Sequence, residues 1–156
     1  MRQYFLDTSA ALKFYHNEAG SSEVLAIFAE ADRAIRISSL GLLELQSAFA
    51  IKVRSGLLHQ EAAELQRARL IHDIQAERIE VYSMSDDHSR AAGSLIHRYG
   101  YSERLRSLDS LQLAVALDLA EQRLLDVFVV ADHVLADIAT REGLKVFNPN
   151  SPAAQQ

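Results

Sequence analysis

The sequence has no cysteine, no tryptophan and only two prolines. Without cysteine the chain cannot form a disulfide, a thiolate nucleophile, a cysteine-ligated zinc site or an iron–sulfur cluster. It also lacks an apolar run of the roughly 18 residues that cross a bilayer, and the acid Asp7 interrupts the N-terminus before a signal-type apolar segment develops. These absences predict a protein of the cytoplasm, a reducing compartment, with no membrane association.

Positive charge is in deficit, because 16 Lys and Arg face 21 Asp and Glu and give a formal net charge of −5. Bulk attraction to phosphate therefore cannot by itself explain an interaction with nucleic acid, and the placement of the charges has to decide. The 156 residues, 49% hydrophobic and 24% charged, are typical of one globular domain. We expect that domain over residues 1–147 and a C-terminal tail over 148–156, which holds both prolines.

Short apolar runs alternate with helical patterns along the chain. The expected strands cover 4–6, 34–38, 79–84, 127–131 and 144–147. The expected helices follow Asp7, surround residues 24–28, and cover 39–56, 58–77, 86–99, 107–123 and 132–143. The helix over 58–77 is expected to have an apolar stripe that includes Leu65 and Ile71. Strands separated by helices predict a mostly parallel sheet covered on both faces, a three-layer α/β/α fold.

Two aspartates directly follow expected strands. In open α/β sheets, ligands bind beyond the carboxyl ends of the strands. Asp7 follows the first strand and Asp132 the fourth, so a parallel sheet places both carboxylates at one edge. Each also precedes a helix, where Asp is a favoured N-cap. Capping is therefore the simpler explanation for either residue taken alone.

Two further acids lie in apolar surroundings. Glu44 stands among leucines, and a carboxylate that faces the core costs several kcal/mol unless it is paired, neutralised or bound to metal. Asp109 lies near the start of a leucine-rich helix, where it also favours the helix dipole. Glu44 therefore requires a partner, while for Asp109 the structural and functional explanations stay equally open.

Convergence of the four acids would require cations. If they lie within about 5 Å of one another at an effective dielectric of about 20, each pair repels by roughly 3 kcal/mol. An all-oxygen site without cysteine or a close histidine pair prefers hard ions, so we expect Mg²⁺, with Mn²⁺ as the alternative. No metal-site spacing links five of the histidines, which we expect at the surface: His16, His59, His72, His88 and His133.

Four segments together resemble the PIN-domain nucleases, and within them the VapC-type toxin ribonucleases of bacterial and archaeal toxin–antitoxin pairs. They are FLDTSAALKFY near the N-terminus, LGLLELQSAF, LRSLDSLQLAVAL, and FVVADHVLADIATREGLKVFNP near the C-terminus. The resemblance covers nearly the whole chain in order and spacing. It implies that the acidic quartet of the family, catalytic and metal-binding, falls on Asp7, Glu44, Asp109 and Asp132. Its supporting hydroxyl falls on Thr8 or Ser9.

The activity that the resemblance implies is endonucleolytic hydrolysis of phosphodiester bonds in RNA, assisted by one or two divalent ions and without a covalent protein nucleophile. It also implies a cognate antitoxin protein that covers the active site, and a homodimer. An RNA that approaches an acidic pocket needs cations at the rim. We expect phosphate contacts from four basic residues, Lys13, Arg98, Arg104 and Arg106. Tyr99 and Tyr101 would be free to stack on bases, although a solvated loop explains this region equally well.

Other functions fit parts of the sequence. A phosphatase of the haloacid dehalogenase type needs an acid two residues after the first aspartate, where Ser9 stands. A receiver-type signalling module needs adjacent acids after the first strand, and Asp7 stands alone there. The same fold acting as an RNA-binding or partner-binding module without cleavage stays open, because a fold does not fix an activity.

Overall fold

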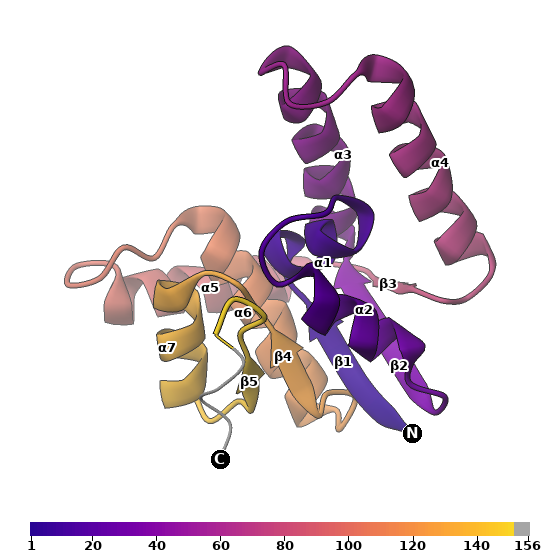
Figure 1. Cartoon of the computed structure of the whole chain (residues 1–156). Helices are drawn as coiled ribbons and strands as arrows, with labels where there is room; N and C mark the ends of the chain where they lie inside the picture. The colour runs from indigo at the N-terminus through magenta and orange to yellow at the C-terminus, as the bar shows by residue number, and fades with distance from the viewer. Residues whose placement is uncertain (152–156) are drawn as a thin grey trace.

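Five strands form one sheet in the order β3-β2-β1-β4-β5 in the computed structural model, which describes residues 1–151 (Figure 1). The strands are β1 (Arg2–Leu6), β2 (Arg33–Ser38), β3 (Glu80–Tyr82), β4 (Val127–Val129) and β5 (Val146–Phe147). Every neighbouring pair is parallel, and Tyr4 of β1 stands opposite Ile35 on one side and Val127 on the other. The predicted parallel sheet is therefore confirmed.

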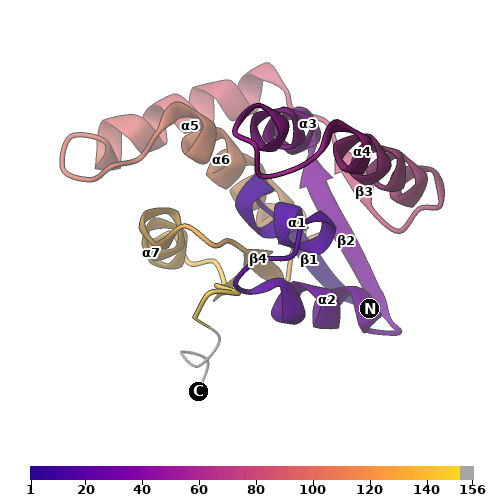
Figure 2. The same ribbon diagram turned by 45° about the horizontal axis from the view of Figure 1, so that its top comes forward.

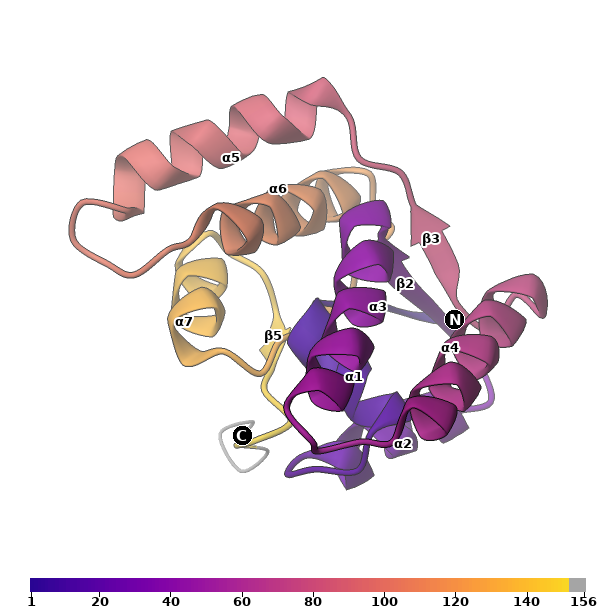
Figure 3. The same ribbon diagram turned by 90° about the horizontal axis from the view of Figure 1, so that it is seen from above.

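Helices cover both faces of this sheet. In the described part of the chain they are α1 (Thr8–Tyr15), α2 (Ser21–Ala29), α3 (Ser39–Arg54), α4 (Gln60–Gln75), α5 (Asp86–Tyr99), α6 (Ser107–Glu121) and α7 (His133–Arg141). Because strand residues alternate between faces, Tyr4 and Leu6 belong to the core shared with α1 to α4, while Phe5 belongs to the core shared with α5 to α7. Figure 3 shows the two groups of helices on opposite sides, which confirms the three-layer α/β/α fold.

The helix pair α3 and α4 projects beyond the sheet (Figure 1), and Figure 2 shows α1 between α2 and α3. The side of α4 that packs inward carries Ala63, Leu70 and Asp73, all of them buried. The predicted apolar stripe is wrong at Leu65, whose exposed fraction is 73%. Other helices cover α4 along one side only. The residues on that side are buried, whether or not they belong to the apolar stripe read from the sequence.

The C-terminal strands are shorter than predicted, and the chain folds back after β5 instead of leaving the domain. Asn148 donates a side-chain hydrogen bond to the Ala131 carbonyl at 3.4 Å, and Pro149 is buried. The first part of the expected tail thus packs against the domain, whereas residues 152–156 lie outside the described residues. Across residues 1–151, none of the helices has the length and apolar character needed to span a membrane.

Candidate active site

A cavity of about 430 Å³ lies at the carboxyl edge of the sheet, where the chain leaves β1 and β4. Four carboxylates from distant parts of the sequence line it: Asp7, Glu44, Asp109 and Asp132. Both predicted hydroxyl residues, Thr8 and Ser9, line it too, as do the predicted cations Lys13 and Arg106. The remaining lining residues are Leu12, Glu18, Gln112, Ala131 and Asn150. The parallel sheet therefore brings all four predicted acids to one cavity.

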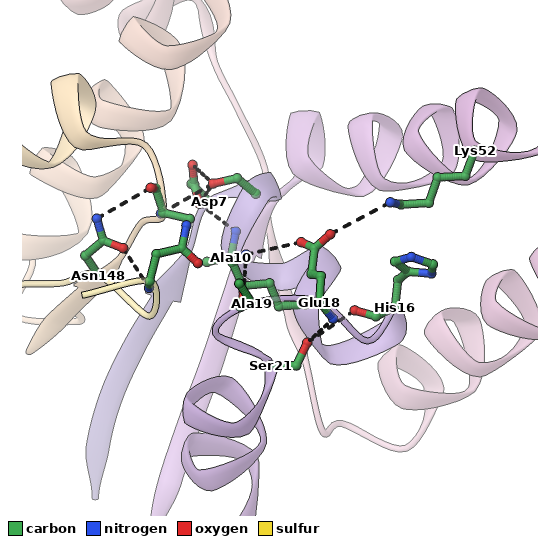
Figure 4. Close-up of polar contacts among 12 residues, drawn as sticks. Asp7, Ala10, His16, Glu18, Ala19, Ser21, Lys52 and Asn148 are labelled. Atoms are coloured by element: carbon green, nitrogen blue, oxygen red, sulfur yellow. Dashed lines mark hydrogen bonds and ion pairs between the residues drawn. The ribbon is translucent and has the colours of Figure 1, made fainter. Parts of the chain in front are cut away.

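Asp7 is the most deeply buried of these acids, with an exposed fraction of 5%. It caps α1 by accepting the Ala10 N–H at 2.9 Å, and the Ser9 hydroxyl lies 2.8 Å from both of its oxygens (Figure 4). The pKa of Asp7 is raised to about 7, chiefly because the carboxyl is buried; the negative charges of Asp109 and Glu44 also raise it, and the hydrogen bonds from Ala10 and Ser9 lower it. Capping and a place in the acidic cavity are thus combined in one side chain.

Glu44 has the partners that its apolar surroundings require. Its Oε1 accepts hydrogen bonds from the Thr8 hydroxyl at 2.8 Å and from the Gln112 amide at 3.0 Å. The Gln112 carbonyl accepts in turn from the Ser38 hydroxyl at 2.9 Å, and that same oxygen of Ser38 caps α3 by accepting the Gly41 N–H at 2.8 Å. A chain of hydrogen bonds from the end of β2 through α6 therefore fixes the carboxylate of Glu44.

The other two acids are held less deeply. Asp109 accepts a hydrogen bond from Arg106 Nε at 3.0 Å, and its side chain is 17% exposed. Asp132 caps α7 by accepting the Leu135 N–H at 2.9 Å. The capping explanation of Asp132 is therefore correct, and it does not exclude a second role because the same side chain faces the cavity.

The predicted phosphate contacts divide into two pairs. Arg106 lines the cavity, and so does Lys13, although the ammonium of Lys13 is engaged by Glu18 at 3.2 Å and by the Ala19 carbonyl at 2.6 Å. Arg98 and Arg104 do not line the cavity. Arg98 belongs to α5 and is held by an ion pair with Glu142 at 2.7 Å, at the end of α7.

The donor atoms of the cavity fit a hard divalent ion, since they are carboxylate and hydroxyl oxygens without sulfur or imidazole. Among the side chains of residues 1–151, no three Asp, Glu, His or Cys residues are grouped so that they could hold a metal ion. Asp7 and Asp132 are turned to helix N-termini and Asp109 to Arg106. In the described part of the chain the four acids therefore line one cavity without forming a group of three possible metal ligands.

Sequence reasoning missed three polar residues of the cavity: Glu18, Gln112 and Asn150. Gln112 had a detectable signal, because it interrupts the run of leucines and alanines in α6. One prediction was wrong outside the cavity. His88 is predicted at the surface but is buried. There Asp118 lies 2.9 Å from its Nε2, and the Ser85 N–H donates to its Nδ1 at 2.9 Å.

Comparisons with known proteins identify the family of this chain. The PIN domain family model matches residues 4–141. VapC20 of Mycobacterium tuberculosis, described as a toxin that cleaves the sarcin–ricin loop, has a TM-score of 0.63 at 16% identity over 86% of this chain and 94% of its own. FitAcB of Neisseria gonorrhoeae has a TM-score of 0.64 at 19% identity, over 94% of this chain and 97% of its own. VapBC2 of Rickettsia felis, bound to a DNA fragment from its promoter, has a TM-score of 0.62 at 19% identity, over 93% of this chain and 97% of its own.

No curated protein sequence matches the chain. At 16% and 19% identity the solved structures establish a shared fold, and the family model supplies the assignment. Its match begins inside β1 and ends with α7, so it includes all four acids of the cavity. This chain belongs to the PIN domain family.

Proposed function

We propose that this protein is a divalent-metal-dependent endoribonuclease, the toxin of a type II toxin–antitoxin pair. The observation that carries the proposal is the set of carboxylates Asp7, Glu44, Asp109 and Asp132, which four separate segments bring to one cavity beside two cationic side chains. Sites that hydrolyse phosphodiesters with metal ions need such oxygen donors around an open, solvent-accessible space. VapC20, of the same fold, is described as a toxin that cleaves the sarcin–ricin loop.

The four acids would hold Mg²⁺ or Mn²⁺, directly or through water. A bound ion supplies a more acidic water and stabilises charge on the phosphoryl group and the leaving oxygen. The hydroxyl groups of Ser9 and Thr8 orient Asp7 and Glu44 through the hydrogen bonds described above. Arg106 reaches the cavity from the N-cap position of α6, where an exposed guanidinium can contact an RNA phosphate.

An antitoxin partner is part of the proposal. FitAB, VapBC2 and a Klebsiella pneumoniae toxin–antitoxin complex share this fold. A largely apolar groove of about 350 Å³ between α3 and α4, lined by Phe49, Ala50 and Val53 among others, fits an apolar helix of such a partner. We also propose a homodimer and a location in the cytoplasm.

The second candidate is a module that binds RNA or a protein without cleaving. The absence of a preformed group of three metal ligands within residues 1–151, together with the ion pair of Arg106 with Asp109, favours it. A fluorogenic RNA incubated with Mg²⁺, with Mn²⁺ and with a chelator separates the two. The nuclease cleaves only with metal, and Asp7→Asn lowers the rate at least about a hundredfold. Equal traces in all conditions would establish the non-catalytic module.

A further inference from the structure

The cavity continues past the acids to a wall that the proposed hydrolysis does not use. Two side chains from opposite ends of the chain form it: Glu18, in the loop between α1 and α2, and Asn150, beyond β5. Neither belongs to the acidic quartet. RNA nucleases of this kind must hold the bases next to the scissile phosphate as well as the phosphate itself, and single-stranded bases are read at their hydrogen-bonding edges.

Glu18 is held in place by its neighbours. Lys13 donates to its Oε1 at 3.2 Å, and Lys52 of α3 lies 3.8 Å from its Oε2 (Figure 4). Its backbone N–H donates to the Ser21 hydroxyl at 2.9 Å, which fixes the loop. A carboxylate offers about four acceptor positions, so each oxygen of Glu18 can still accept one more hydrogen bond in the open cavity.

Asn150 is placed beside this loop by a tight backbone approach. Its backbone N–H donates to Asn148 Oδ1 at 2.9 Å, and Asn148 is tied to Ala131. Gly20 has φ +84, and a Cβ there would lie 2.9 Å from Asn150 Oδ1 and from the Pro149 carbonyl. Only a glycine therefore lets the C-terminal segment come this close. Within residues 1–151 the Asn150 side-chain amide donates no hydrogen bond, which leaves both of its N–H groups for a ligand.

We propose that Glu18 and Asn150 form a base-reading subsite that selects guanine next to the scissile phosphate of the RNA. This inference rests on the proposed ribonuclease function. Guanine carries two adjacent donors, N1–H and N2–H, which match the two oxygens of a fixed carboxylate, and beside them the O6 acceptor, which matches an amide N–H. Glu18, two residues before Gly20, and Asn150, which packs against Gly20, line the same cavity and supply that set.

The other bases do not match a fixed carboxylate. Adenine and cytosine present one amino donor next to a ring nitrogen that accepts, so a carboxylate oxygen would face a lone pair. Uracil presents a single N–H between two carbonyl oxygens. A site built to pair with specific donors discriminates against ligands that lack them, because its polar groups then lose hydrogen bonds that the right base would make. Glu18 and Asn150 are thus specificity-determining residues and not catalytic ones.

The experiment maps cleavage on short RNAs that differ in one base next to the cut, with Mg²⁺ present. The wild type is expected to prefer guanine about tenfold or more, and inosine, which lacks the N2 amino group, is expected to lose most of that preference. Glu18→Gln and Asn150→Ala should each reduce the preference severalfold while cleavage beside other bases continues. Glu121→Gln, an exposed glutamate at the end of α6, is the charge-matched control and should leave it unchanged.

A binding measurement separates this proposal from the proposed hydrolysis. Asp7→Asn protein without metal is titrated with fluorescent short RNAs that do or do not contain guanine, with and without Glu18→Gln. Guanine-selective binding in a protein that never cleaves RNA would overturn the hydrolysis and leave the subsite standing. Cleavage without base preference, or a preference that both subsite variants keep, would overturn the subsite alone. If the protein showed no cleavage and no guanine-selective binding, both the hydrolysis and the subsite would be overturned.

Discussion

At the scale of single residues, the buried carboxyl of Asp7 makes stability depend on pH. Burial raises the pKa of Asp7 from 3.8 to about 7 in the folded protein. Between these values the unfolded chain has already released the proton that the folded chain still holds, so the free energy of unfolding falls as the pH rises. The penalty is complete above pH 7 and absent below the unfolded pKa.

Asp7→Asn is expected to remove this penalty in metal-free protein, because asparagine also caps helices and carries no charge. The variant should match the wild type near pH 4 and exceed its free energy of unfolding by roughly 1–4 kcal/mol above pH 7. Denaturant titrations with a chelator across this range measure the difference. Asp137→Asn, at an exposed position of α7, controls for charge alone. Parallel pH curves for wild type and Asp7→Asn would contradict the expectation.

At the scale of elements, the start of α3 and the side chain of Gln112 in α6 approach closely at Gly41. A Cβ on Gly41 would lie 3.3 Å from both Gln112 Nε2 and Ser38 Oγ, the two groups that connect β2 to the Glu44 network. A Cβ at this position crowds Gln112, which would have to shift by a few tenths of an ångström within the Glu44 network.

Gly41→Ala is therefore expected to lower the free energy of unfolding by about 1–3 kcal/mol and to reduce RNA cleavage, since Glu44 loses a donor. Gly93→Ala is the matched control, because a Cβ on that glycine of α5 meets nothing within 4 Å. The control should gain about 0.4–1 kcal/mol through a less flexible unfolded chain and keep full activity. Urea titrations and the fluorogenic RNA assay measure both. Equal stability changes in the two variants would refute a tight approach at Gly41.

The elements also show how far sequence reasoning reaches. Periodicity located each strand and helix, and the rule that parallel strands end at one edge placed Asp7 and Asp132 together. It failed at Leu65, because burial on α4 depends on which side faces α3. It could not find Asn150, whose place in the cavity depends on a contact with Gly20 across 130 positions of sequence. Such long-range approaches leave no local pattern.

At the scale of the whole molecule, the carboxylates of the cavity add to a net charge that is already −5. A divalent ion that binds among them relieves this repulsion and favours the folded state by mass action. Mg²⁺ and Mn²⁺ are therefore expected to raise the melting temperature of the wild type by several degrees, reversibly on addition of chelator. The gain should be much smaller in Asp7→Asn. Thermal scans at fixed ionic strength measure it, and an identical gain in both proteins would contradict metal binding at this cavity.

The order of the strands determines when the cavity can be completed during synthesis. Because β1 pairs with β4, Tyr4 cannot pair with Val127 until the ribosome has synthesised and released β4. Asp132 and Asn150 follow later still. A nascent chain that ends before β4 therefore contains three of the four acids but cannot yet form the cavity that all four line. In the proposed toxin–antitoxin pair, such late assembly would leave the antitoxin time to bind before the cavity is complete.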